Sequence, residues 1–175
     1  MKKLIPFLFL MFILLTAGCK KDSKDNTDPE PTSATVPAGE LHFTYDNGIA
    51  KKNIVYKKLN VNVVKQGMMY RTTIAEVNDA YGEFEIQIDG DRVAKEFPLF
   101  GYLVLIRYSP SRLVDTTPLN RYASENCREY NGSIKITEFD IQNKVISGTF
   151  SGTLCSPFSG PKTEVSGSFN KLQYK

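Results

Sequence analysis

The amino-acid sequence predicts an all-β domain, an antiparallel β-sandwich or a flattened β-barrel of about 8–10 strands. Apolar and polar side chains alternate with a period of two in several windows, as in strands that have one buried and one solvated face. No window of about 12 residues or more carries a convincing apolar stripe of helical period with helix caps. This pattern leaves the sandwich and the barrel both open.

The clearest strands lie in the first two thirds of the domain. In residues 82–90, Phe and Ile occupy one face, and Glu, Gln and Asp occupy the other. Residues 59–63 and 68–74 alternate in the same way around a turn at 65–67 and predict a hairpin. Residues 100–108 are apolar on both faces, which predicts a central strand covered on both sides.

The C-terminal third predicts a second hairpin, made of residues 132–140 and 145–154. We expect Ile136 to pair with Ile146 if neither strand contains a bulge. With these partners, Cys127 would face Cys155 near the open end of the hairpin. The two remaining cysteines of an exported protein favour a disulfide over two separate buried thiols.

Two segments of similar sequence, ISGTF at 146–150 and VSGSF at 165–169, place a glycine and a phenylalanine on the same face of a strand. Glycine weakens a strand but lets a neighbouring ring lie across it. We expect aromatic rings to cover Gly148 and Gly167 in adjacent strands. A groove lined by these glycines is the alternative.

The N-terminus has the features of a signal peptide that is removed, residues 1–18. Two lysines precede an apolar run of 12 residues, 4–15, too short for the ~20 residues that cross a bilayer as a helix. The run ends in LTAGC at 15–19, which resembles the lipobox of bacterial lipoproteins. The resemblance implies cleavage before Cys19 and attachment of acyl chains such as palmitate to this residue. An ordinary signal peptide is the alternative.

Residues 19–40 are predicted to form the lipidated cysteine and a disordered tether, followed by a single all-β domain at 41–175. The tether contains proline, aspartate, serine and threonine and almost nothing to bury. Asp22 and Asp25 resemble the acidic surface-export signal of Bacteroidota-type lipoproteins, although neighbouring lysines dilute it. The predicted location is the outer membrane, on the cell surface or on the periplasmic face.

The charge of the processed chain argues against a nucleic-acid partner. Removal of residues 1–18 leaves 22 − 2 = 20 basic and 19 acidic residues, a formal net charge of +1. Nucleic-acid binding requires a basic patch or stripe.

The segment GSIKITEFDIQNKVISGTFSGTL at 132–154 resembles the C-terminal signature of a family of uncharacterised Bacteroidota-type lipoproteins. In that family a Gly-x-Ile-x-Ile-Thr strand, an Asp turn, an Asn-Lys pair and an Ile-Ser-Gly-Thr-Phe strand follow one another. The resemblance covers residues 1–20 and 132–169. It implies a β-rich lipoprotein without an assigned activity, and it does not imply the disulfide.

No catalytic, metal-binding or cofactor motif is found in the sequence. His42 is the only histidine of the chain, and its setting predicts an exposed or half-packed strand residue. Glu83 and Glu85 share a strand face at a spacing suited to glycosidase carboxylates, but a solvated strand produces the same pattern. We therefore expect no enzyme, no metal and no cofactor.

The longest segment without alternation, residues 109–132, is the candidate recognition loop. Tyrosine and arginine, which are enriched at binding hot spots, lie in this loop and at its start. The candidate recognition residues are Tyr108, Arg112, Arg121, Tyr122, Arg128 and Tyr130. An irregular cover over a sheet edge, held by the disulfide, is the alternative.

Together these features predict a membrane-anchored envelope lipoprotein that acts as a non-enzymatic binding or interaction module. Its partners would be the membrane, through the lipid, and an envelope protein, a glycan or a small apolar ligand. The alternative function is a small-ligand carrier with a lipocalin-like cavity.

Overall fold

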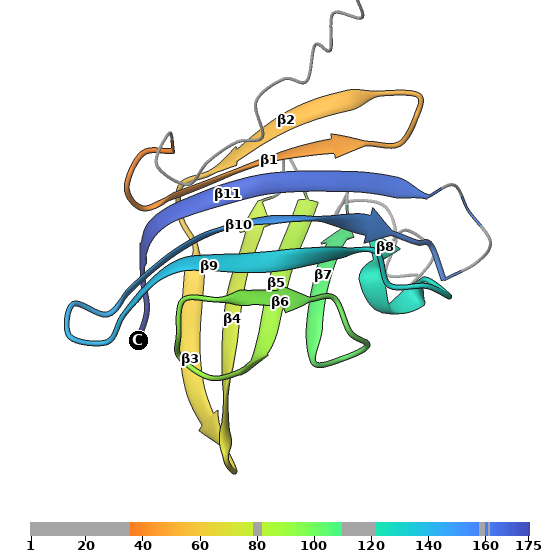
Figure 1. Ribbon diagram of the computed structural model, residues 1–175. Helices are drawn as coiled ribbons and strands as arrows, with labels where there is room; N and C mark the ends of the chain where they lie inside the picture. Colours follow the sequence, from red (N-terminus) through yellow and green to blue (C-terminus); the bar gives the residue numbers. More distant parts are fainter. Residues whose placement is uncertain (1–35, 79–81, 110–121, 158–159, 161) are drawn as a thin grey trace, which may run out of the picture.

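The computed structural model describes residues 36–78, 82–109, 122–157, 160 and 162–175, and nearly all of them belong to two antiparallel sheets (Figure 1). The six-stranded sheet has the order β2-β1-β11-β10-β9-β6, and the five-stranded sheet has the order β3-β4-β5-β7-β8. Within the described residues the sheets do not close into a barrel, so the fold is an all-β sandwich.

The six-stranded sheet contains both ends of the described chain. Its members are β1 (Glu40–Asp46), β2 (Lys51–Tyr56), β6 (Glu96–Pro98), β9 (Gly132–Asp140), β10 (Val145–Leu154) and β11 (Thr163–Gln173). The five-stranded sheet consists of β3 (Asn60–Gln66), β4 (Met69–Asn78), β5 (Gly82–Gly90), β7 (Val104–Ser109) and β8 (Tyr122–Ala123). A short 3₁₀ helix, Ser124–Asn126, follows β8.

The described residues thus form 11 strands, more than the 8–10 expected. The shortest of them are β6 with 3 residues and β8 with 2 residues. Segments this short are too brief to show a readable alternation, because at least four residues are needed to define a period of two.

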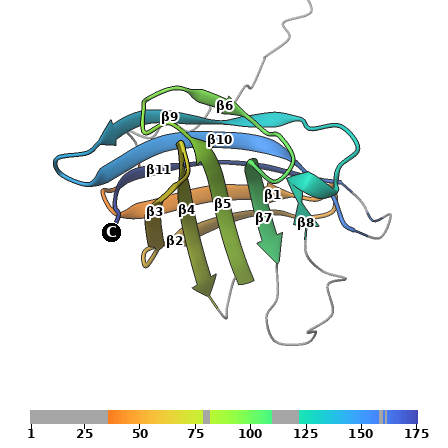
Figure 2. The ribbon, with the colours of Figure 1, turned by 90° about the horizontal axis from the view of Figure 1, so that it is seen from below.

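The strands of the two sheets run crosswise to each other, which both views show (Figures 1 and 2). Such orthogonal packing is one of the two usual arrangements of stacked sheets. Aromatic rings fill the centre: Phe43 of β1 stacks on Phe84 of β5, with 4.8 Å between ring centroids, and meets Tyr108 of β7 edge-on at 5.3 Å. Burial raises the pKa of Tyr108 to about 12.

The expected cover of strand glycines by aromatic rings is confirmed, and it is reciprocal. In the β10–β11 pair, Gly148 lies opposite Phe169 and Phe150 lies opposite Gly167. A Cβ atom added at Gly148 would lie 2.7 Å from Cζ of Phe169, and one at Gly167 would lie 2.5 Å from Cζ of Phe150. Each ring therefore occupies the space that a side chain on the opposite glycine would need.

The C-terminal hairpin forms over the predicted residues, but the predicted pairing of Ile136 with Ile146 is wrong. Ile146 pairs with Phe139, and Ile136 pairs with Gly148. The carboxylate of Asp140 accepts hydrogen bonds from the backbone N–H groups of Gln142 and Asn143, which fixes the turn at residues 141–144, directly before β10. A register shift between Ser147 and Gly148 then moves the remaining pairs by one residue.

The predicted central strand at 100–108 is correct only for its second half. β7 begins at Val104 and lies between β5 and β8. Residues 100–103 form a turn, with Gly101 at φ 53°, and the side chains of Phe100 and Tyr102 are exposed. The left-handed backbone at Gly101 ends the extended conformation there.

The predicted tether also ends earlier than residue 40. Val36 is buried, and its carbonyl accepts a hydrogen bond from the side-chain amide of Asn170. The N–H of Gly39 donates to the carbonyl of Asn170 at 2.7 Å. Packing against β11 therefore includes Val36 and Gly39 of the predicted tether, and residues 1–35 lie outside the described part of the chain.

Replacing Gly167 by alanine is expected to lower the free energy of unfolding by about 1–3 kcal/mol, because the new methyl group would collide with the Phe150 ring and with the carbonyl of His42. Urea denaturation of the purified chain measures this change. The control is Ser166→Ala on the opposite face, which should change stability by less than about 0.5 kcal/mol. An equal effect of the two substitutions would contradict the role of the reciprocal pairs.

Candidate functional site

The outer face of the six-stranded sheet carries a row of short hydroxyl side chains that crosses four adjacent strands. Thr44 of β1 pairs with Ser166 of β11, Ser166 pairs with Ser151 of β10, and Ser151 pairs with Ser133 of β9. These four residues, called the hydroxyl row below, alternate along their strands with core residues and therefore face away from the core.

The two ends of the hydroxyl row are bonded within the sheet. The Thr44 hydroxyl donates to the side-chain oxygen of Asn53, and the Ser133 hydroxyl donates to Glu96 at 2.6 Å. No described residue forms a side-chain hydrogen bond with Ser151 or Ser166, and both are half-buried. The centre of the row therefore offers hydroxyl groups to a ligand.

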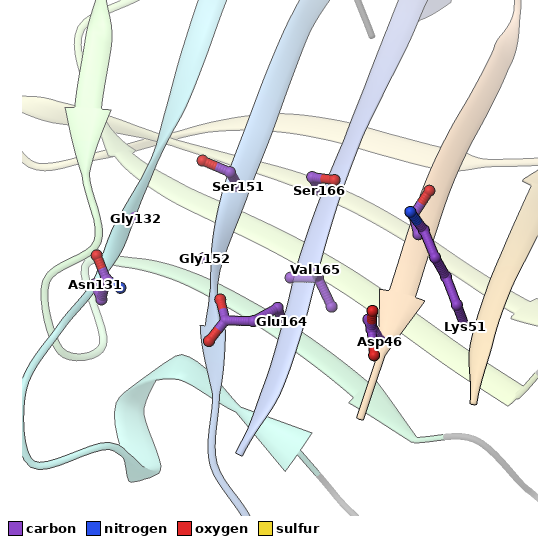
Figure 3. Close-up of a pocket in the computed structure, with 10 residues that line it drawn as sticks. Asp46, Lys51, Asn131, Gly132, Ser151, Gly152, Glu164, Val165 and Ser166 are labelled. Atoms are coloured by element: carbon purple, nitrogen blue, oxygen red, sulfur yellow. The ribbon is translucent and has the colours of Figure 1, made fainter. Parts of the chain in front are cut away.

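A second row of longer polar side chains lies beside the hydroxyl row (Figure 3). Asp46 of β1 pairs with Lys51 of β2 on one side and with Glu164 of β11 on the other. Glu164 in turn pairs with Thr153 of β10, whose hydroxyl donates to its carboxylate at 2.8 Å. Asn131 donates to the same hydroxyl oxygen at 3.3 Å.

Three hollows on this face adjoin one another, because they share lining residues, and together they are called the trough below. The first, of about 330 Å³, is lined by Ser151 and Ser166 together with Asp46, Lys51 and Glu164. The second, of about 180 Å³, shares Ser151 with it and reaches toward β6. The third, of about 850 Å³, shares Asn131 and Glu164 with the first and reaches the disulfide.

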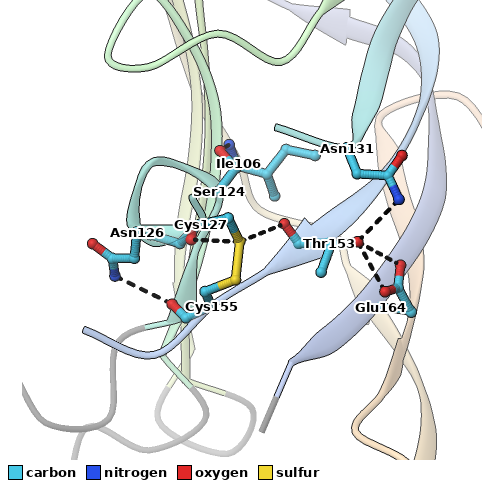
Figure 4. The surroundings of a disulfide bond; sticks show 9 residues. Ile106, Ser124, Asn126, Cys127, Asn131, Thr153, Cys155 and Glu164 are labelled. Atoms are coloured by element: carbon cyan, nitrogen blue, oxygen red, sulfur yellow. Dashed lines mark hydrogen bonds between the residues drawn. A yellow bond between two sulfur atoms is a disulfide. The ribbon is translucent and has the colours of Figure 1, made fainter. Parts of the chain in front are cut away.

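The predicted disulfide, Cys127–Cys155, is present at this end of the trough (Figure 4). It does not join paired residues of the C-terminal hairpin, as the predicted register implied. Cys155 forms a two-way backbone bridge with Ala123 of β8, with both N–O distances at 3.0 Å. The bond and the bridge therefore connect the edge of the five-stranded sheet to the end of β10 in the six-stranded sheet.

The structure separates the candidate recognition residues into three groups. Arg128 and Tyr130 are exposed and line the third hollow, so they belong to the trough. Tyr108 lies in β7 with 3% of its surface exposed, and Tyr122 of β8 packs edge-on against Tyr45; neither belongs to an exposed loop. Two more candidates, Arg112 and Arg121, lie outside the described residues.

The central residues of the trough were not identified from the sequence. Ser151 and Ser166 lie within or next to the two similar segments in which only the glycine and phenylalanine positions were interpreted. The sequence does contain a signal for them, because serine and threonine occupy the positions that alternate with the glycine and phenylalanine in those segments. One strand alone cannot show that these hydroxyls align across four strands, because alignment depends on the register.

An exposed aromatic pair adjoins the third hollow. The rings of Tyr130 and Phe100 lie edge-to-face with 5.9 Å between their centroids, and 44% of Tyr130 and 61% of Phe100 are exposed. The N–H of Leu99 donates to the carbonyl of Gly132, which holds the turn before β7 against the start of β9. An aromatic face is thus available beside a polar depression.

The residues weighed for catalysis are tied into local contacts. His42 Nε2 lies 2.7 Å from Glu40 Oε2. Glu85 forms an ion pair with Arg107, which also binds Glu125, so this strand face carries a charge network. Among the described residues, no group of three or more His, Cys, Asp or Glu side chains is arranged to hold a metal ion. No helix in the described ranges is long and apolar enough to cross a bilayer.

Comparisons of the chain with protein-family models, with curated proteins and with solved structures find no match.

Replacing both Cys127 and Cys155 by serine is expected to lower the free energy of unfolding by about 3–4 kcal/mol in the chain-entropy model, for a sequence separation of 28. Urea denaturation with and without a reductant measures the change. The reduced protein should match the double variant, and the variant should not respond to the reductant. An unchanged unfolding midpoint on reduction would show that the bridge does not constrain the chain.

Proposed function

We propose that the protein is a lipoprotein of the bacterial envelope that acts as a non-enzymatic binding module, with the trough as its binding surface. The observation that carries this proposal is that three hollows adjoin one another on the same face of the sheet. They share Ser151, Asn131 and Glu164 as lining residues. Many of the side chains that line it carry hydroxyl, amide or charged groups, which suits recognition of a ligand by hydrogen bonds.

The position of the trough fits a protein held at its N-terminus. The described chain enters at Val36, beside Asn170 and the start of β1, whereas the largest hollows lie near Asp46 at the other end of this strand. The 7 residues of β1 span roughly 20 Å. An anchor at Cys19 would therefore leave the trough at the end of the domain away from the tether.

The alternative function, a carrier with a lipocalin-like cavity, has no support from the interior. The buried side chains of both sheets belong to one packed core cluster, which includes Phe43, Phe84, Phe150 and Phe169. The two sheets remain an open sandwich in the described residues. A carrier requires a barrel or cavity wide enough to enclose its ligand.

Intact-mass analysis of the protein extracted from its own envelope tests the anchor. We expect a chain that begins at Cys19 and carries the mass of a diacylglycerol and an amide-linked acyl group, because LTAGC precedes the domain. Cys19→Ala should abolish acylation and membrane association, whereas the double serine variant of the disulfide should keep both. An unacylated N-terminus in the wild-type protein would overturn the lipoprotein assignment.

The trough is tested by capture from detergent-solubilised envelope, with the chain from residue 20 onward immobilised through a tag placed before this residue. Ser166→Arg fills the centre of the trough, and Asn62→Arg adds the same charge to an exposed position of β3 in the other sheet. We expect wild type and Asn62→Arg to retain about tenfold more of a specific component than Ser166→Arg. Equal retention by all three proteins would overturn the binding-module proposal.

A further inference from the structure

We propose that the trough binds an uncharged, extended polysaccharide that runs across the strands along the hydroxyl row. This inference rests on the proposed binding function and specifies its ligand. It is supported by the spacing of the hydroxyls, by the charge balance of the lining, and by the carboxylate and aromatic groups beside the row.

The hydroxyl row repeats at the spacing of the strands. Thr44, Ser166, Ser151 and Ser133 stand on four neighbouring strands, which lie ~4.8 Å apart. One pyranose unit of an extended chain covers a similar length, so successive sugars can meet successive hydroxyls. Each serine or threonine hydroxyl both donates and accepts, as sugar hydroxyls do. Short side chains also lose little rotamer entropy when a ligand binds.

The charges of the lining cancel. The three hollows contain four acidic side chains, Asp46, Glu96, Glu129 and Glu164, and four basic side chains, Lys51, Lys135, Arg128 and Lys162. The two signs are interspersed. Lys51 of β2 lies opposite Asp46 of β1, and Glu96 of β6 lies opposite Lys135 of β9. A strongly anionic or cationic polymer would meet repulsion along part of this path, whereas a neutral polymer would not.

Asp46 and Glu164 are paired on adjacent strands and both line the first hollow, where the Glu164 carboxylate points toward β10, away from Asp46 (Figure 3). Like charges directly opposite each other destabilise a sheet. Hydrogen-bond donors relieve this cost: the Thr153 hydroxyl already donates to Glu164, and the Gly48 N–H donates to Asp46. Sugar hydroxyls would supply further donors to the same carboxylates, and charge-assisted hydrogen bonds of this kind are stronger than neutral ones.

Tyr130 supplies an aromatic face at the end of the trough, where its ring is braced by Phe100. The C–H face of a pyranose ring is apolar and packs on such a surface. A peptide strand is a poorer occupant, because the backbone groups of β9, β10, β11 and β1 are already paired within the sheet and cannot bind an added strand.

The probe is the neutral polysaccharide fraction of the envelope of the producing cells, freed of protein and separated from the acidic fraction by anion exchange. Titration calorimetry of the processed protein in detergent micelles is expected to show binding of the neutral fraction. Partial hydrolysates should bind more tightly from disaccharide to tetrasaccharide and gain little beyond hexasaccharide, because the sheet has six strands.

The variants distinguish the trough from other surfaces. Ser166→Arg is expected to abolish the binding, and Asn62→Arg to leave it unchanged. Tyr130→Ala should weaken binding about tenfold, whereas Tyr130→Phe, which keeps the ring, should not. A circular dichroism spectrum and an unfolding midpoint equal to those of the wild type confirm that each variant is folded.

Any of four outcomes would overturn the inference. Binding of the acidic fraction alone, or binding that Ser166→Arg does not affect, would exclude a neutral chain on the hydroxyl row. If the neutral fraction does not bind while Ser166→Arg still eliminates capture of a protein component from the envelope, the binding module stands and its ligand is not a glycan. If neither assay depends on Ser166, the proposed function and this inference fail together.

Discussion

The fold depends on the reciprocal glycine–phenylalanine pairs at the centre of the six-stranded sheet. Phe150 lies over Gly167 and Phe169 lies over Gly148, and no other register of β10 and β11 satisfies both contacts. The Phe150 ring also meets the core of the opposite sheet, since its centroid lies 5.5 Å from that of Phe84 in β5. The glycines of β10 and β11 and the rings that cover them therefore fix the register of these two strands, and the Phe150 ring contributes to the contact with the other sheet.

The same segments build the trough. In β10 and β11, glycine and phenylalanine occupy one face, and serine and threonine occupy the other, so the core register also sets which hydroxyls align on the outer face. A slip by one residue would bury Ser151 and Ser166 and expose both rings. The hydroxyl row is thus maintained by core packing and needs no hydrogen bonds of its own at its centre.

The sequence was sufficient for the fold class, for most strands and for the disulfide, because each depends on local alternation or on the parity of cysteines. It was insufficient for strand pairing and for burial, because both depend on residues that are distant in the chain. The pairing of Ile136 was mispredicted because the turn pairs Asp140 with Val145, and a register shift then places Ile136 opposite Gly148, which alternation along one strand does not reveal. Tyr108 was placed in a recognition loop, although its strand lies between two others and its ring is buried. Among the candidate recognition residues that the structure describes, only Arg128 and Tyr130 line the trough, because they follow the segment that the disulfide holds against β10.

The disulfide connects stability to the proposed recognition. It lies where the edge of the five-stranded sheet meets the end of β10, and the adjoining residues 128–131 form one wall of the largest hollow. Without the bridge, Arg128, Tyr130 and Asn131 would be held mainly by the hydrogen bonds of Asn131 and of Gly132. The four residues of the hydroxyl row, in contrast, belong to central strands whose backbones are paired on both sides. The trough therefore combines a rigid floor, fixed by core packing, with one wall whose position depends on a covalent bond.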